Sequence, residues 1–364
     1  MTESGGVHNE NSGKVSGISF QARDVHGNVT LQHRAAGADE LLAGYLADAV
    51  RELSRKEEDH WRIGDPAPLS VRWHSAEQDL FDYWENIQAS PQRADPVSLS
   101  GEFTTIRETF KATGSQRLLV LGRAGAGKTV LAHRLVLDLI EHRDHRAPVP
   151  VLFSLSDWNP ITTGLRDWMA NRLVRDHPFL AKHDVTGKRS AELLVDRDWV
   201  LPVLDGFDEL PEQHRRAAIS EISRVRWPLM VTSRPAEYAQ AAREVKAVGR
   251  AAAIELEDLT LEQTEQYLRR SSNPSRATEW ECIFEYLRTE PATIASRNLA
   301  PVVTTPLMVM LARTTYNDVN ENSPGNCLIP HASLPVMIWN SICWVAMWTP
   351  STPTTTPYHP DPQS

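Results

Sequence analysis

The chain has little cysteine, no dense run of basic residues and no long apolar run. Its 364 residues contain three cysteines without CxxC spacing, which argues against a disulfide framework and against a zinc site. The formal net charge of −9 argues against a general nucleic-acid-binding protein, because such proteins carry a basic surface. We therefore expect no DNA-binding role.

The apolar stretches are also too short for a membrane span. The most apolar one, residues 334–348, has about 15 residues, whereas a membrane-spanning helix needs roughly 20. The N-terminal sequence MTESGGVHNENSGKVSG is polar and lacks the apolar core of a signal peptide. These features predict a cytoplasmic protein without a clear membrane span.

An alternation of apolar strands and amphipathic helices is present between residues 117 and 258. Five apolar runs predict strands, at 117–121 (RLLVL), 148–155 (PVPVLFSL), 199–204 (WVLPVL), 228–233 (PLMVTS) and 251–256 (AAAIEL). Helical patterns lie between them, at 128–142, 163–176 and 212–224. This order predicts an α/β fold, with a parallel sheet covered by helices on both faces.

The flanking segments differ in character. Residues 1–38 alternate apolar and polar positions around a His-Gly-Asn turn, which predicts a flexible or β-like segment. Residues 39–60 predict a helix and residues 61–100 a Pro-rich linker, whose tryptophans we expect to serve packing. Residues 259–320 show only helical patterns and predict a small helical domain.

A phosphate-binding motif follows the first strand. The sequence GRAGAGKT at 122–129 fits G-x-x-x-x-G-K-[ST] and opens a helix. Its backbone N–H groups can surround phosphate oxygens, which makes the whole loop a candidate nucleotide site: Gly122, Arg123, Ala124, Gly125, Ala126, Gly127, Lys128 and Thr129. Lys128 would bridge the β- and γ-phosphates, and Thr129 would bind Mg²⁺. The alternative is a chance match in a glycine turn.

Three acids end the third predicted strand, in the sequence LDGFDEL. Asp205 would hold Mg²⁺ directly or through water, and the cation would offset the repulsion among the carboxylates. Asp208 and Glu209 lie at the same sheet edge, where one of them can polarise a water for attack on the γ-phosphate. The alternative is an exposed acidic turn that caps the next helix.

An arginine ends the fourth predicted strand. Arg234, in VTSRP, falls at the carboxyl edge of the sheet, where open α/β sheets bind ligands. A guanidinium there can sense the γ-phosphate and stabilise developing charge. The alternative is a surface arginine paired with a carboxylate.

With these motifs, the chain resembles the NACHT family of signal-transducing ATPases with numerous domains, the STAND class. The distinctive part is LDGFDEL, in which a small residue follows the magnesium-binding acid and two further acids come after it. GRAGAGKT, VTSRP and TPLMVMLARTTY also look like successive motifs of that family. The resemblance covers about residues 118–316.

The resemblance implies a NACHT nucleotide-binding domain at 101–258, with ATP or ADP and Mg²⁺ as ligands. It implies that Pro306, in the helical domain, contacts the adenine side of the nucleotide. It also implies a switch that hydrolyses ATP slowly. ADP would hold a closed monomer and ATP would permit homo-oligomerisation, in response to an unknown trigger and toward an unknown effector. In bacteria such proteins typically serve antiphage defence or other conflict signalling.

Both ends of the chain raise separate expectations. The N-terminal ISFQARDVHGNVTLQ resembles short amyloid-type signalling motifs, the alternative being a plain hairpin or a disordered tail. The tail at 321–364 changes character, because Asp361 is the only Asp, Glu, Lys or Arg from 323 onward. We interpret it as a possible frameshift product, the alternative being a native partner-binding or membrane-surface segment. The winged-helix histidine that the family places on the β-phosphate has no counterpart here.

Two other functions stay open at this point. The chain is either a switch of this kind or a non-signalling P-loop enzyme, such as a kinase or a DNA-dependent ATPase. A third possibility is a scaffold that assembles through its N-terminal segment and keeps a vestigial nucleotide site.

Overall fold

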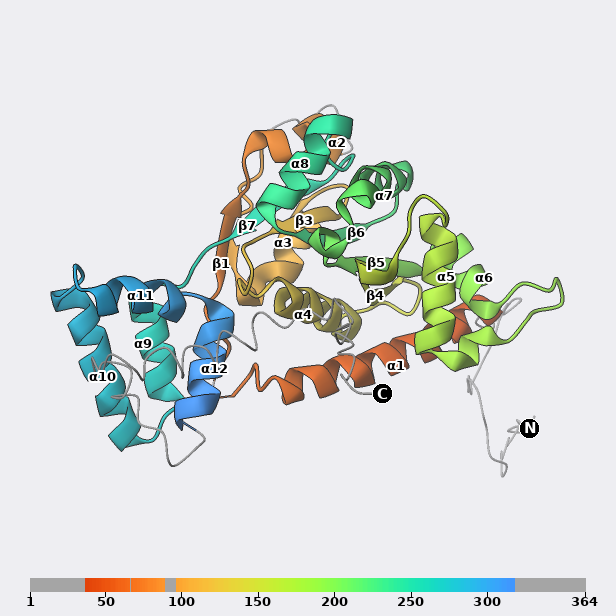
Figure 1. The fold of residues 1–364 in the computed structure, drawn as a ribbon. Coiled ribbons are helices and arrows are strands. Elements are labelled where there is room, and N and C mark those ends of the chain that lie inside the picture. Colours follow the sequence, from red (N-terminus) through yellow and green to blue (C-terminus); the bar gives the residue numbers. More distant parts are fainter. Residues whose placement is uncertain (1–36, 66, 89–95, 318–364) are drawn as a thin grey trace, which may run out of the picture. The chain divides into compact units, whose positions relative to one another are not determined.

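The computed structural model describes residues 37–65, 67–88 and 96–317 (Figure 1). The tail at 321–364 and nearly all of the N-terminal segment at 1–38 lie outside the described residues. The predictions of an amyloid-type motif and of a frameshift therefore stay predictions.

The described residues contain a seven-stranded sheet of order β2-β1-β7-β3-β6-β5-β4. All five predicted strands are confirmed, as β3 (Arg117–Leu121), β4 (Val149–Ser154), β5 (Val200–Asp205), β6 (Leu229–Ser233) and β7 (Ala252–Leu256). Neighbours among these five pair in parallel. Because every residue of β3 is buried, this strand lies between layers that cover both faces.

Helices cover the two faces of the sheet, as Figure 1 shows. One face carries α1 (Ala38–His60), α3 (Ile106–Ala112) and α4 (Lys128–Glu141), and the other carries α7 (Glu212–Arg224) and α8 (Pro235–Val245). The chain between β4 and β5 forms α5 (Leu165–Asp176) and α6 (Ser190–Asp196). The expected α/β architecture and the helices expected at 39–60, 128–142, 163–176 and 212–224 are confirmed.

Two short antiparallel strands extend the parallel sheet, which makes the sheet mixed. β1 (Arg72–Ser75) pairs with β7, and β2 (Gly101–Glu102) pairs with β1. β1 lies inside residues 61–100, which the sequence indicates as a linker. Trp73 anchors it, with 1% of its surface exposed and its ring N–H donating to the carbonyl of Leu99 at 2.8 Å. A strand of four residues among prolines is too short for its alternation to be recognised.

Short elements complete this part of the chain: η1 (Gln78–Leu80), α2 (Trp84–Ile87), η2 (Phe103–Thr105), η3 (Leu155–Asp157), η4 (Pro178–Ala181) and η5 (Phe207–Glu209). The last of these, η5, lies directly after β5 and carries the acids of LDGFDEL. It therefore lies at the carboxyl edge of the parallel sheet.

Four helices follow β7: α9 (Leu261–Arg270), α10 (Pro274–Thr289), α11 (Ile294–Val303) and α12 (Pro306–Asn317). A capping box starts α9, since the Thr260 hydroxyl accepts from the N–H of Gln263 and the Gln263 amide oxygen accepts from that of Thr260. The expected helical region is confirmed, but α11 was not recognised in the sequence. Its Pro301 lacks an N–H and is unfavourable inside a helix, which hides the pattern.

Candidate functional site

The loop between β3 and α4 carries the motif GRAGAGKT. Gly125 and Gly127 adopt backbone φ angles of 76° and 94°, in the left-handed region that glycine reaches without strain. Gly127 is the N-cap of α4, so the unpaired N–H groups of the first helical turn lie at this loop. Such N–H groups, together with the helix dipole, favour an anion at the start of α4.

Lys128 turns its ammonium group back over the loop. Its Nζ donates to the carbonyls of Gly122 at 2.8 Å and Arg123 at 3.1 Å. Burial lowers the pKa of Lys128 and the Arg234 guanidinium adds to this effect, while the carboxylates of Asp208 and Asp205 act in the opposite direction. The lysine is therefore a partly buried cation between the loop and the acids, where an anion would stabilise its charged form.

Asp205, the last residue of β5, is fixed by two hydroxyl groups. Thr129 donates to its Oδ2 at 2.9 Å, and the buried Thr232 donates to its Oδ1. Thr232 also accepts from the N–H of Gly206 at 2.9 Å. Hydroxyl and carboxylate oxygens are the ligands that Mg²⁺ prefers, so this pair fits the metal once phosphate and water oxygens complete its shell. The described residues contain no cluster of three or more His, Cys, Asp or Glu side chains suited to a metal.

Asp208 forms an ion pair with Arg234. The side chain of Asp208 is 8% exposed, and its Oδ2 lies 2.9 Å from Nε of Arg234. The backbone N–H of Arg234 donates to the other carboxylate oxygen at 3.1 Å. Arg215, on α7, donates to the backbone carbonyls of Asp208 at 2.9 Å and Leu210 at 3.0 Å. Arg234 thus lies at the carboxyl edge of the sheet and is paired with a carboxylate, while its role toward a γ-phosphate stays a prediction.

Glu209 has a pKa above the usual range of a glutamate. Burial is the largest cause, and the charges of Asp205 and Asp208 add to it. The preceding Gly206 has a φ of 80°, and a Cβ there would come within 2.9 Å of the Glu209 carboxyl carbon. Glycine at this position therefore leaves room for the Glu209 carboxyl group, and the raised pKa makes Glu209 a better proton acceptor.

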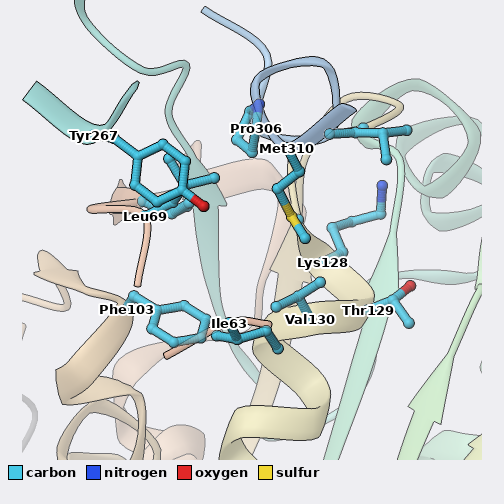
Figure 2. Close-up of a pocket in the computed structure, with 13 residues that line it drawn as sticks. Ile63, Leu69, Phe103, Lys128, Thr129, Val130, Tyr267, Pro306 and Met310 are labelled. Atoms are coloured by element: carbon cyan, nitrogen blue, oxygen red, sulfur yellow. The ribbon is translucent and has the colours of Figure 1, made fainter. Parts of the chain in front are cut away.

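A cavity of about 250 Å³ adjoins the phosphate-binding loop (Figure 2). Residues from the loop and α4 form one side, and α9, α12 and the chain around β1 form the other. The lining residues are Ile63, Leu69, Val71, Phe103, Gly125, Gly127, Lys128, Thr129, Val130, Tyr267, Pro306, Leu307 and Met310. Figure 2 shows Lys128 and Thr129 at one side and the rings of Tyr267 and Phe103 at the other. The cavity is thus polar toward the loop and apolar away from it.

The start of α12 contacts the phosphate-binding loop directly. The N–H of Leu307 donates to the carbonyl of Gly125 at 3.1 Å. A Cβ on Gly125 would lie 2.9 Å from Cγ2 of Thr305, and one on Gly127 would lie 4.0 Å from Cβ of Pro306. Small residues in the loop therefore allow α12 to pack against it, and Pro306 lines the cavity.

The comparison with protein families agrees with this geometry. The model described as "NACHT domain" matches residues 116–273. Over these residues the chain is similar to a NACHT domain. It has the α/β fold of a P-loop NTPase, and a domain of this kind supports nucleotide binding and hydrolysis, generally with Mg²⁺.

Other comparisons add less to the NACHT assignment. No curated protein matches the chain. It is similar to the structure titled "Structure of C. elegans PCH-2", with 11% sequence identity, coverage of 70% of this chain and 71% of that chain, and a TM-score of 0.33.

Within the described residues no single helix is long and apolar enough to span a membrane. One pair of consecutive helices, Ile294–Val303 and Pro306–Tyr316, has the required length and composition when taken together, but the two helices are bent by 101°.

The fold brings most of the candidate residues together at one sheet edge. Asp205, Asp208 and Glu209 lie beside the loop that carries Lys128 and Thr129. The exceptions lie within the loop itself, where the side chains of Arg123 and Ala124 are exposed and Arg123 forms an ion pair with Asp258. Of these two residues, Arg123 contacts Lys128 through its backbone carbonyl.

Sequence reasoning missed two groups of residues at this site. Thr232 precedes the recognised Arg234 by two positions, and its place at the end of a buried strand was the available signal. Ile63, Leu69 and Tyr267 line the cavity but are ordinary apolar or aromatic residues in sequence. No motif marks them, so only the fold could reveal that they line the same cavity as the loop.

Proposed function

We propose that the chain is an ATP-binding switch of the STAND type, which hydrolyses ATP slowly and acts in the cytoplasm. The observation that carries this proposal is the shared cavity. Its polar side belongs to the phosphate-binding loop, and its apolar side includes α9 and α12 of the helical region. A nucleotide there would contact both parts of the chain, so its identity would influence how they pack.

The polar side of the site would hold the phosphates and the metal. The loop amides and Lys128 would bind the β- and γ-phosphates, and Thr129 and Asp205 would hold Mg²⁺. The bound cation would neutralise charge on the phosphate oxygens. Glu209, with its raised pKa, would orient and deprotonate the attacking water, while Arg234 would stabilise charge on the γ-phosphate.

The apolar side would hold the base. Among the lining residues Met310, Leu69 and Val130 offer apolar contact, and Pro306 lies next to Gly127 of the loop. No lining side chain carries a carboxylate or amide that would pair with the N1–H and exocyclic amine of guanine. We therefore expect ATP to bind more tightly than GTP.

Exchange of ADP for ATP would release the closed arrangement and permit homo-oligomerisation. The hydrogen bond from Leu307 to Gly125 supports this view, because it joins the helical region to the loop that would hold the phosphates. We also propose that the switch signals to an effector and serves antiviral defence. This part of the proposal is supported by the family resemblance alone.

Calorimetric titration with Mg²⁺-ATP tests the site, with Lys128→Ala as the variant and Lys111→Ala, an exposed lysine on α3, as the control. We expect the parent and the control to bind ATP and the Lys128 variant to lose measurable binding. Unchanged affinity in the Lys128 variant would contradict the proposed site. Light scattering of the parent with ATP and with ADP tests the switch, and identical masses at all concentrations would contradict nucleotide-dependent assembly.

A further inference from the structure

Arg313 on α12 is a nearly buried cation, with 6% of its surface exposed. Its guanidinium donates to the hydroxyl of Tyr267 at 3.0 Å, to the backbone carbonyl of Arg62 at 3.4 Å and to a carboxylate oxygen of Asp65 at 3.2 Å. Burial of a guanidinium is unfavourable unless its N–H groups are satisfied. These contacts therefore fix where its partners lie.

The partners come from two segments far apart in the sequence. Tyr267 belongs to α9, whereas Arg62 and Asp65 lie in the segment between α1 and β1. Asp65 also pairs with the side chain of Arg62 at 3.2 Å. Arg62 adopts a φ of 52°, a left-handed conformation that is unfavourable for a side-chain-bearing residue. Its carbonyl contact to Arg313 offsets part of that strain.

Both segments form walls of the cavity beside the phosphate-binding loop. Tyr267 lines it directly, and the neighbour of Arg62, Ile63, lines it from the other segment. Met310, one turn before Arg313 on α12, lines it as well. Figure 2 shows Tyr267, Ile63 and Met310 around the same space. Arg313 thus joins three elements that meet at the apolar part of the cavity.

We propose that Arg313 is a positioning residue that assembles the base-binding wall of the nucleotide site. It does so by holding the Tyr267 ring and the 62–65 segment in register with α12. This inference rests on the proposed nucleotide function. It assigns a role in base recognition to a residue that itself does not line the cavity, and it leaves phosphate binding to the loop.

The inference separates base binding from phosphate binding, and this separation can be measured. The parent, Arg313→Met and Tyr267→Phe are titrated with a fluorescent ATP analogue and, in competition, with inorganic tripolyphosphate, each with Mg²⁺. Arg313→Met keeps an unbranched apolar side chain and removes the guanidinium with its donors. We expect it to weaken ATP binding by about 10- to 100-fold and to change tripolyphosphate binding by less than about twofold.

Tyr267→Phe removes one oxygen and leaves Arg313 with an unsatisfied donor. We expect it to weaken ATP binding by about three- to tenfold and to leave tripolyphosphate binding nearly unchanged. Both changes remove the hydrogen bond between Arg313 and the Tyr267 hydroxyl. Their losses of ATP affinity should therefore not add in the double variant. Arg269→Ala on α9 removes an exposed ion pair with Glu281 of α10. It is the matched control and should leave the binding of both ligands unchanged.

Equal losses for ATP and tripolyphosphate would show a general loss of structure and would overturn the inference, as would unchanged ATP binding in both variants. Circular dichroism and thermal unfolding identify a variant that fails to fold. If Arg313→Met does not fold, the binding of ATP and tripolyphosphate by Tyr267→Phe tests the inference instead. Failure of the proposed function is a different result, since the parent and Arg269→Ala would then bind no ATP.

Discussion

Thr232 offers the sharpest test of how the candidate metal position is held. Its fully buried hydroxyl donates to Oδ1 of Asp205 and accepts from the N–H of Gly206. Thr232→Val preserves the shape of the side chain and removes both hydrogen bonds. The Asp205 carboxylate then keeps only its bond from Thr129, at 2.9 Å, among these hydroxyl contacts.

The magnitude follows from the two lost bonds. A hydrogen bond to an ionised group is worth about 1.5–3 kcal/mol, and a buried N–H left without a partner costs about 1–3 kcal/mol. Partial relaxation reduces the sum, so we expect the free energy of unfolding to fall by about 2–4 kcal/mol. Loss of a group that orients a metal ligand typically weakens metal binding by about 10- to 100-fold. The Mg²⁺ concentration needed for ATP binding should rise by a similar factor.

Urea unfolding measures the first effect, and titration of ATP binding with Mg²⁺ measures the second. Thr232→Ser is the matched control, because it retains the hydroxyl and should keep most of both properties. A Thr232→Val protein with the parental Mg²⁺ dependence would refute the argument that this hydroxyl orients Asp205, even if its stability fell as expected.

Two further predictions concern the acids and the sheet. Burial and the neighbouring Asp205 and Asp208 raise the pKa of Glu209 in the folded state. The contribution of this carboxyl to stability is thus full below its unfolded pKa and is lost as pH rises through its folded pKa. Glu209→Gln should therefore be more stable than the parent at pH 8, lose that advantage near pH 4 and release phosphate from ATP more slowly. Thermal unfolding at both pH values and a phosphate-release assay check this, and a pH-independent difference in stability would contradict it. Arg117, fully buried at the start of β3, donates to four backbone carbonyls at 2.9–3.0 Å. Arg117→Met should lower the free energy of unfolding by about 3–5 kcal/mol, because these carbonyls lose their donors, and a loss below about 1 kcal/mol in urea unfolding would oppose this account.

The phosphate side of the site could be predicted from sequence because it is local. Eight consecutive residues, 122–129, supply the loop, and the acids at 205–209 end a strand whose apolar run is plain in the sequence. Parallel strands place their carboxyl ends at one edge of the sheet, so the meeting of Thr129 and Asp205 follows from topology. The observed 2.9 Å contact between their side chains agrees with that argument.

The base side could not be predicted in the same way because it is assembled from distant segments. Leu69 and Tyr267 are nearly two hundred positions apart, and neither residue type differs from those of an ordinary core. The segment that carries Leu69 is rich in proline, and this obscured both the cavity wall and β1. Pro306 was assigned only through the family resemblance. Apolar recognition surfaces leave a weaker sequence signal than phosphate sites, since burial in a core demands the same residues.

Under the proposed function, the two sides of the site would respond differently to ADP and ATP. The two nucleotides share a base, so the contacts of Tyr267, Met310 and Pro306 would be the same for both and would not discriminate between them. A ligand shifts a conformational equilibrium only through contacts that differ between the states. The difference must therefore arise where the γ-phosphate would lie, next to the ion pair of Arg234 with Asp208. A γ-phosphate would compete with Asp208 for the guanidinium, and Asp208 lies in the turn that also holds Glu209. Replacing that ion pair is the local event by which ATP, and not ADP, would rearrange the acidic turn.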